Sequence, residues 1–219
     1  MLRKMKAIAA AATIAGVVAL AGASNASALN VGTIGTPVGT GSMTQTALAG
    51  SSRIVINSAL PYNCTTTGST SNINTGVYGL PAAVGTTQLQ FSSCNSVFGS
   101  FVWACTSTTS YTFTGAPVGG VTAGSYTGIS CLITSSAVGC SATLSGSMPV
   151  RYTNPSATTP GVVTVLTAGQ ALTLSGSTCP PAILPNGSVQ FGAPSGSGTS
   201  LANLNYTLTG ASTTHPFVS

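Results

Sequence analysis

Two short runs, Ile129-Ser130-Cys131-Leu132-Ile133 and Cys140-Ser141-Ala142-Thr143-Leu144, decide the fold class of this chain. In both, apolar or cysteine residues recur at every second position, and most residues between them are Ser or Thr. Because successive side chains of a β-strand point to opposite faces, this alternation predicts strands that are buried on one face. A further strand is expected at residues 53–57. The other alternating sets are Leu89/Phe91, Phe101/Trp103/Cys105, Val163/Val165, Leu172/Leu174, Val189/Phe191 and Leu204/Tyr206/Leu208.

Turn-forming residues separate these runs at intervals typical of antiparallel sheets. They occur at 61–63, 115–117, 153–155, 185–187 and 195–198. Intervals of roughly 8–12 residues favour an all-β fold, an antiparallel β-sandwich or a flattened barrel. We expect a single β domain over residues 48–219, preceded by a flexible lead-in at 29–47.

The charge distribution predicts export. The chain has 219 residues, with five Lys and Arg and no Asp or Glu. Three of the cations lie within the first six residues, and an apolar stretch follows from Ala7 to about Gly22. After it, Ala26-Ser27-Ala28 supplies small residues of the kind that a signal peptidase accepts. Residues 1–28 are therefore expected to be a signal peptide, since the apolar stretch is shorter than the roughly 20 residues that a transmembrane anchor needs. The mature chain would be secreted, extracellular or in the cell wall, with no transmembrane anchor and no nucleic-acid partner.

The six cysteines predict three disulfides. They are Cys64, Cys94, Cys105, Cys131, Cys140 and Cys179, an even number with no metal-binding spacing. Six cysteines allow 15 pairings. If the two opening runs form a hairpin over residues 134–139, Cys131 lies opposite Cys140, within reach of a disulfide, and Cys105 would join Cys179.

A second pairing comes from a family resemblance. Residues 139–192, including Leu172-Thr173-Leu174-Ser175-Gly176-Ser177-Thr178-Cys179, resemble the C-terminal half of a family of small secreted actinobacterial β-proteins. Those proteins are Thr/Gly-rich and functionally uncharacterised, and the likeness extends loosely over residues 50–210. The resemblance implies the pairs 64–94 and 140–179, which leaves 105–131. It implies no catalytic residue. We favour this sequential set and keep the hairpin set open.

The missing carboxylates exclude most enzyme chemistry. Paired-carboxylate hydrolysis and a Ser-His-Asp triad both require Asp or Glu, and the one histidine, His215, lies in a tail that we expect to be frayed. We therefore predict no catalytic residue, cofactor or metal site. Three residues are candidate ligand contacts. Trp103 packs either in the core against a disulfide or on the surface as a sugar-stacking platform. Arg53 and Arg151 lie either on solvated strand faces or against an anionic envelope polymer.

Three functions are compatible with these observations. The first is a secreted, non-enzymatic structural or cell-surface β protein with a coat, adhesion or assembly role, whose partners are itself or cell-envelope components. Low charge favours it, because little repulsion opposes association between copies. The alternatives are a binding module for a neutral cell-wall glycan and an outer-envelope β-barrel or pore.

Overall fold

The computed structural model describes residues 28–34, 41–47, 51–65, 69–74, 76–105, 109–135, 137–156, 159–210 and 215–218. These residues form 18 strands and no helix, so the predicted all-β fold is confirmed. The expected signal peptide lies almost entirely outside them. The strands are β1 (Ala28–Ile34), β2 (Gly41–Ala47), β3 (Ser51–Ile56), β4 (Leu60–Thr65), β5 (Ser69–Ile73), β6 (Gly76–Gly79), β7 (Ala82–Thr87), β8 (Ser92–Ser96), β9 (Gly99–Cys105), β10 (Thr109–Phe113), β11 (Val121–Ser135), β12 (Cys140–Thr153), β13 (Gly161–Val165), β14 (Ala171–Ser175), β15 (Gly187–Pro194), β16 (Leu201–Ala202), β17 (Leu204–Gly210) and β18 (His215–Val218).

A long hairpin of β11 and β12 forms the centre of the fold. The two strands pair from Val121↔Thr153 to Ser135↔Cys140, with an irregularity in register between Tyr126 and Ile129. This irregularity divides the hairpin into two halves. At the division Gly146 has φ +137°, and a Cβ there would lie 2.0 Å from the carbonyl oxygen of Ala171. Glycine is therefore required where β14 comes close to the hairpin.

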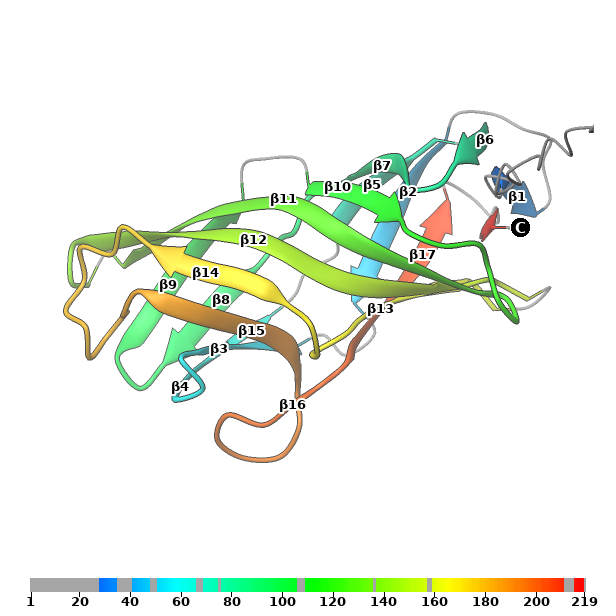
Figure 1. Cartoon of the computed structure of the whole chain (residues 1–219). Helices are drawn as coiled ribbons and strands as arrows, with labels where there is room; N and C mark the ends of the chain where they lie inside the picture. The colour runs from blue at the N-terminus through cyan, green and yellow to red at the C-terminus, as the bar shows by residue number, and fades with distance from the viewer. Residues whose placement is uncertain are drawn as a thin grey trace, which may run out of the picture.

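Each half of the hairpin belongs to a different closed barrel. The Val121–Tyr126 half pairs with β10, and the circuit returns through β7, β5, β2, β17 and β13 to β12. The other half pairs with β9, and that circuit returns through β8, β4, β3, β15 and β14 to β12. Each circuit contains eight strands, all antiparallel to their neighbours. Figure 1 shows β11 and β12 passing from one barrel to the other.

We call the first circuit the tyrosine barrel and the second the disulfide barrel, after the side chains described below. The sequence left a sandwich and a flattened barrel open, and the structure is the closed, barrel form. One predicted strand is missing: residues 88–91, which include the Leu89/Phe91 pair, lie outside the strands and connect the two barrels.

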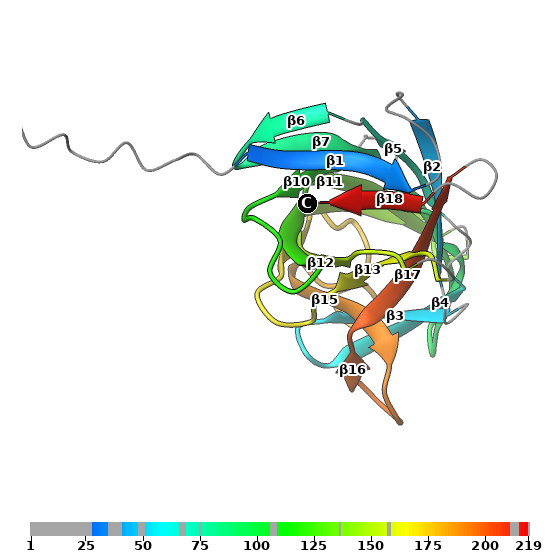
Figure 2. The same cartoon turned by 90° about the vertical axis from the view of Figure 1, so that its right-hand side faces the viewer.

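The structure corrects the prediction of a flexible lead-in at residues 29–47 over its two described parts, 29–34 and 41–47. Strand β2 pairs with β17 and β5 and is one wall of the tyrosine barrel. Strand β1 pairs with β6 and β18 in a separate three-stranded sheet, and its Leu29 and Val31 are buried. Figure 2 shows this sheet across one end of the molecule. The prediction of a flexible lead-in was therefore wrong for these two strands. Their partners, β5, β6, β17 and β18, are distant in the sequence, so the residues of the strands alone did not indicate the pairing.

The C-terminal tail is also part of this sheet. The backbone of β18 pairs with β1, with His215 opposite Ile34. The expectation of a frayed tail was therefore wrong.

Candidate functional site

The interior of the tyrosine barrel contains a cluster of buried aromatic side chains. Tyr111 contacts Phe113 and Tyr126 at ring-centroid distances of 4.9 and 5.2 Å, and Phe113 contacts Tyr152 at 6.1 Å. Tyr206 is buried as well. Burial raises the pKa of Tyr111, Tyr152 and Tyr206 above the ordinary value, and the proximity of Tyr126 adds to the rise at Tyr111 and Tyr206. The cluster fills the barrel with neutral phenols.

All three disulfides belong to the disulfide barrel. Cys64 joins Cys94, Cys105 joins Cys131 and Cys140 joins Cys179. This is the sequential set that the resemblance implied. The β11–β12 hairpin exists as expected, but β11 extends to Ser135, which pairs with Cys140, so Leu144 lies opposite Cys131. The hairpin set of disulfides was therefore wrong.

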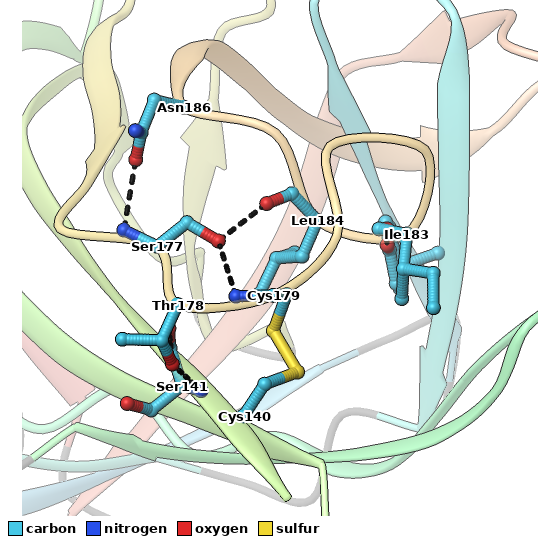
Figure 3. Close-up of a disulfide and its surroundings, with 9 residues drawn as sticks. Cys140, Ser141, Ser177, Thr178, Cys179, Ile183, Leu184 and Asn186 are labelled. Carbon is cyan, nitrogen blue, oxygen red and sulfur yellow. Dashed lines mark hydrogen bonds between the residues drawn. A yellow bond between two sulfur atoms is a disulfide. The ribbon is translucent and has the colours of Figure 1, made fainter. Parts of the chain in front are cut away.

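The Cys140–Cys179 bridge fastens the loop between β14 and β15 to the central hairpin. The Ser177 hydroxyl donates to the carbonyl oxygen of Leu184 and accepts from the amide of Cys179, as Figure 3 shows. The amide of Ser141 donates to the Thr178 hydroxyl. The same loop accepts a hydrogen bond at the Ile183 carbonyl oxygen from Tyr62 on β4. The loop is thus held from two sides of the barrel.

Trp103 lies in the core of the disulfide barrel. Its side chain is 3 % exposed and makes edge contacts with Tyr62 and Phe91, at ring-centroid distances of 6.4 and 6.0 Å. This is the packed arrangement, and the interpretation as an exposed platform is corrected. The indole Nε1 is buried and has no hydrogen-bond partner in the described structure.

The two arginines of the described residues differ in burial: Arg53 is buried and Arg151 is exposed. Arg53 was expected either on a solvated strand face or against an anionic envelope polymer, but its side chain is buried in the protein, with 8 % exposed. Its Nε donates to Asn63 Oδ1 at 2.8 Å, and Nη1 donates to the carbonyl oxygens of Gly196 and Ser200 at 3.2 and 3.1 Å. Arg53 therefore fastens the β15–β16 loop. Arg151 is exposed on β12, between Ala123 and Thr164 on the neighbouring strands.

An open groove runs along β9, on the side away from β11. The β8–β9 ladder pairs Cys94 with Phe101 and continues toward the turn, but it does not extend to Trp103. Ser93 has φ +49°, and the β4–β8 register is irregular at the same place. This bulge separates the chain before Ser93 from β9 and opens the wall of the barrel.

The groove has two hollows that meet at Phe91. One has a volume of about 540 Å³ and is lined by Gln88, Leu89, Gln90, Phe91, Trp103, Ala104 and Cys105. The other has about 530 Å³ and is lined by Phe91, Ser92, Ser93, Asn95, Ser100, Phe101 and Val102. Leu89 and Phe91 also line a nearly filled apolar cavity of about 10 Å³ inside the barrel. These two side chains therefore separate the groove from the interior of the barrel. We call the two hollows together the β9 groove.

Of the candidate ligand contacts, the structure places only Trp103 at this groove. Sequence reasoning missed Gln88, Gln90 and the serines around residue 93. The one available signal was the alternation of amides and apolar residues in Gln88-Leu89-Gln90-Phe91, which we interpreted as a strand.

Comparison with known proteins found no matching family model, no matching curated protein and no matching solved structure. The resemblance to secreted actinobacterial proteins stays a prediction. The described residues bring together no group of three His, Cys, Asp or Glu side chains that could hold a metal ion. Across the same ranges, the chain forms no helix of the length and hydrophobicity needed to cross a lipid bilayer.

Proposed function

We propose that this chain is a non-enzymatic extracellular structural protein that assembles with copies of itself or adheres to the cell envelope. The observation that carries the proposal is its outer surface. Among the described residues, Arg151 is the one charged side chain that is exposed. A surface of hydroxyl, amide and small apolar groups leaves little electrostatic repulsion between neighbouring copies.

Exposed apolar side chains concentrate at one end of the disulfide barrel. Within the described structure the large ones are Val77, Val97, Phe98, Val102, Val118, Leu132 and Val138. Val97 and Phe98 lie in the β8–β9 turn and Val138 in the β11–β12 turn. Val102 and Leu132 are diagonal neighbours on the outer face, because Val102 pairs with Thr134. We call these five residues the apolar tip.

The disulfides and the filled interiors support the same role. Three disulfides fit an oxidising compartment, as expected for an exported protein. Buried tyrosines fill one barrel, and buried aliphatic and aromatic side chains fill the other. Such interiors favour a structural element over a pore.

The test is sedimentation velocity of the oxidised chain at increasing concentration. We expect concentration-dependent association that the double substitution Val102→Lys/Leu132→Lys weakens. Val118→Lys is the matched control, since Val118 is 80 % exposed and lies away from the apolar tip. Fractionation of a secreting culture into medium, wall and membrane tests adherence. A protein that stays monomeric at every concentration and remains entirely in the medium would contradict the proposal.

A further inference from the structure

The β9 groove combines features that suit one class of ligand. Its polar lining consists of the Gln88 and Gln90 amides, Asn95 and three serine hydroxyls, and none of the described lining residues has an ionisable side chain. Phe91, a half-buried aromatic ring, stands between the two hollows. Amide and hydroxyl groups pair with neutral hydroxyls, and an aromatic ring packs against the C–H face of a sugar.

The position of Trp103 and the length of the groove provide the second observation. Trp103 lines the groove from inside the wall. From Ser100 to Cys105 the groove follows β9 for about 17 Å, long enough for an extended chain of several units.

We infer that the β9 groove binds a neutral oligosaccharide, with Phe91 as the packing surface and Gln90 as a hydrogen-bonding side chain. The inference adds a ligand site to the structural role proposed above and does not depend on it. A neutral polymer of the cell envelope would supply such a ligand.

An extended peptide added to the edge of β9 is the main competitor, and the edge argues against it. Peptide strands bind through a run of free main-chain groups. Here Phe101 already pairs with Cys94, and the carbonyl oxygen of Cys105 accepts a hydrogen bond from the Gln88 side chain at 3.1 Å. Alternate residues of a strand direct their main-chain groups to the same edge. Between these two positions, Trp103 alone is left to offer its main-chain groups to a peptide, and one residue is too short a run for an added strand.

Trp103 is the only tryptophan of the chain and lies at the groove, so its fluorescence reports occupancy directly. The probes are maltohexaose, cellohexaose and mannohexaose, with an uncharged Thr/Gly octapeptide for comparison. We expect at least one hexasaccharide to change the Trp103 emission saturably, with calorimetry giving the same affinity.

Two pairs of variants locate the site. Gln90→Ala removes an exposed groove amide and is expected to weaken binding about five-fold, the effect of one lost hydrogen bond. Gln190→Ala is its control, since Gln190 is an exposed strand residue outside the groove. Ala104→Ile narrows the groove and should weaken binding further, while Ala123→Ile, an exposed alanine on the tyrosine barrel, should not.

Thermal melts of the four variants verify that each is folded. The inference is overturned if no hexasaccharide binds, if the octapeptide alone binds, or if the control variants weaken binding as much as Gln90→Ala and Ala104→Ile.

Discussion

The two barrels use the same hairpin and the same number of strands but are stabilised differently. The disulfide barrel has three covalent links between its segments. In the tyrosine barrel the described residues contain no disulfide, and a buried group of phenols fills the interior. Covalent links act mainly by restricting the unfolded chain, whereas packed aromatic rings stabilise only the folded one. The two halves should therefore respond to different perturbations.

Reduction should produce the largest effect, and it should begin in the disulfide barrel. Each bridge closes a loop of 26 to 39 residues and is worth about 3–4 kcal/mol in the chain-entropy model. Loss of all three approaches the whole stability of a typical domain, about 5–15 kcal/mol. We expect a phosphine reductant to shift the Trp103 emission to the red and to abolish amide protection in β3, β4 and β8 before β13 and β17. Unchanged Trp103 emission in the fully reduced protein would contradict the assignment of stability to the bridges.

Alkaline pH should act chiefly on the tyrosine barrel. Burial raises the folded pKa of Tyr111, Tyr152 and Tyr206, and it raises that of Tyr62 in the disulfide barrel to about 12. Below about pH 10 both folded and unfolded chains keep these protons. As the pH rises further the unfolded chain releases protons that the folded chain retains, so stability falls.

At pH 11 the raised pKa of Tyr62 alone should lower the free energy of unfolding by about 1 kcal/mol. The three tyrosines of the tyrosine barrel should lower it further. We expect the thermal midpoint to be flat between pH 3 and 8 and to fall between pH 10 and 12, with amide protection lost first in the tyrosine barrel. Short exposures limit disulfide exchange. Loss of amide protection in β3 and β4 before the strands of the tyrosine barrel would contradict the expectation that alkaline pH acts chiefly on that barrel.

The sequence predicted the strands of both barrels better than their closure. The alternation around Cys131, Cys140 and Leu172 is local, so it identifies strands directly. Closure depends on pairings such as β2 with β17, whose partners are separated by most of the chain. Nothing in the Thr/Gly-rich residues of β2 signals that partner.

The β9 groove was missed for a similar reason. It depends on the left-handed backbone of Ser93, and serine rarely signals that conformation. The burial of Arg53 was missed because its oxygen partners, Gly196 and Ser200, lie in a distant loop. In both cases the deciding interaction is tertiary.

Overpacking at Gly161 should destabilise the tyrosine barrel specifically. A Cβ at Gly161 would lie 2.1 Å from the hydroxyl of Tyr152 and 2.7 Å from its ring, inside the filled interior. We expect Gly161→Ala to lower the free energy of unfolding by about 1–3 kcal/mol. Gly115→Ala is the matched control, because a Cβ there meets no atom within 4 Å. Urea unfolding of both variants measures the difference, and equal stabilities would show that the cluster tolerates added volume.

The smallest expected effect on stability comes from removing a single tyrosine hydroxyl, and its sign should differ between the two barrels. The Tyr62 hydroxyl donates to the Ile183 carbonyl oxygen, whereas the Tyr111 hydroxyl is buried and has no hydrogen-bond partner in the described structure. Removing a bonded hydroxyl leaves its acceptor unpaired, while removing an unpaired one relieves a desolvation cost. Tyr62→Phe should therefore destabilise the protein by about 1 kcal/mol, and Tyr111→Phe should stabilise it by up to about 1 kcal/mol. Both changes keep the ring and its packing, so urea midpoints compare the hydroxyls alone. A loss of stability in Tyr111→Phe as large as in Tyr62→Phe would show that the phenols of the tyrosine barrel are held by hydrogen bonds as well as by packing.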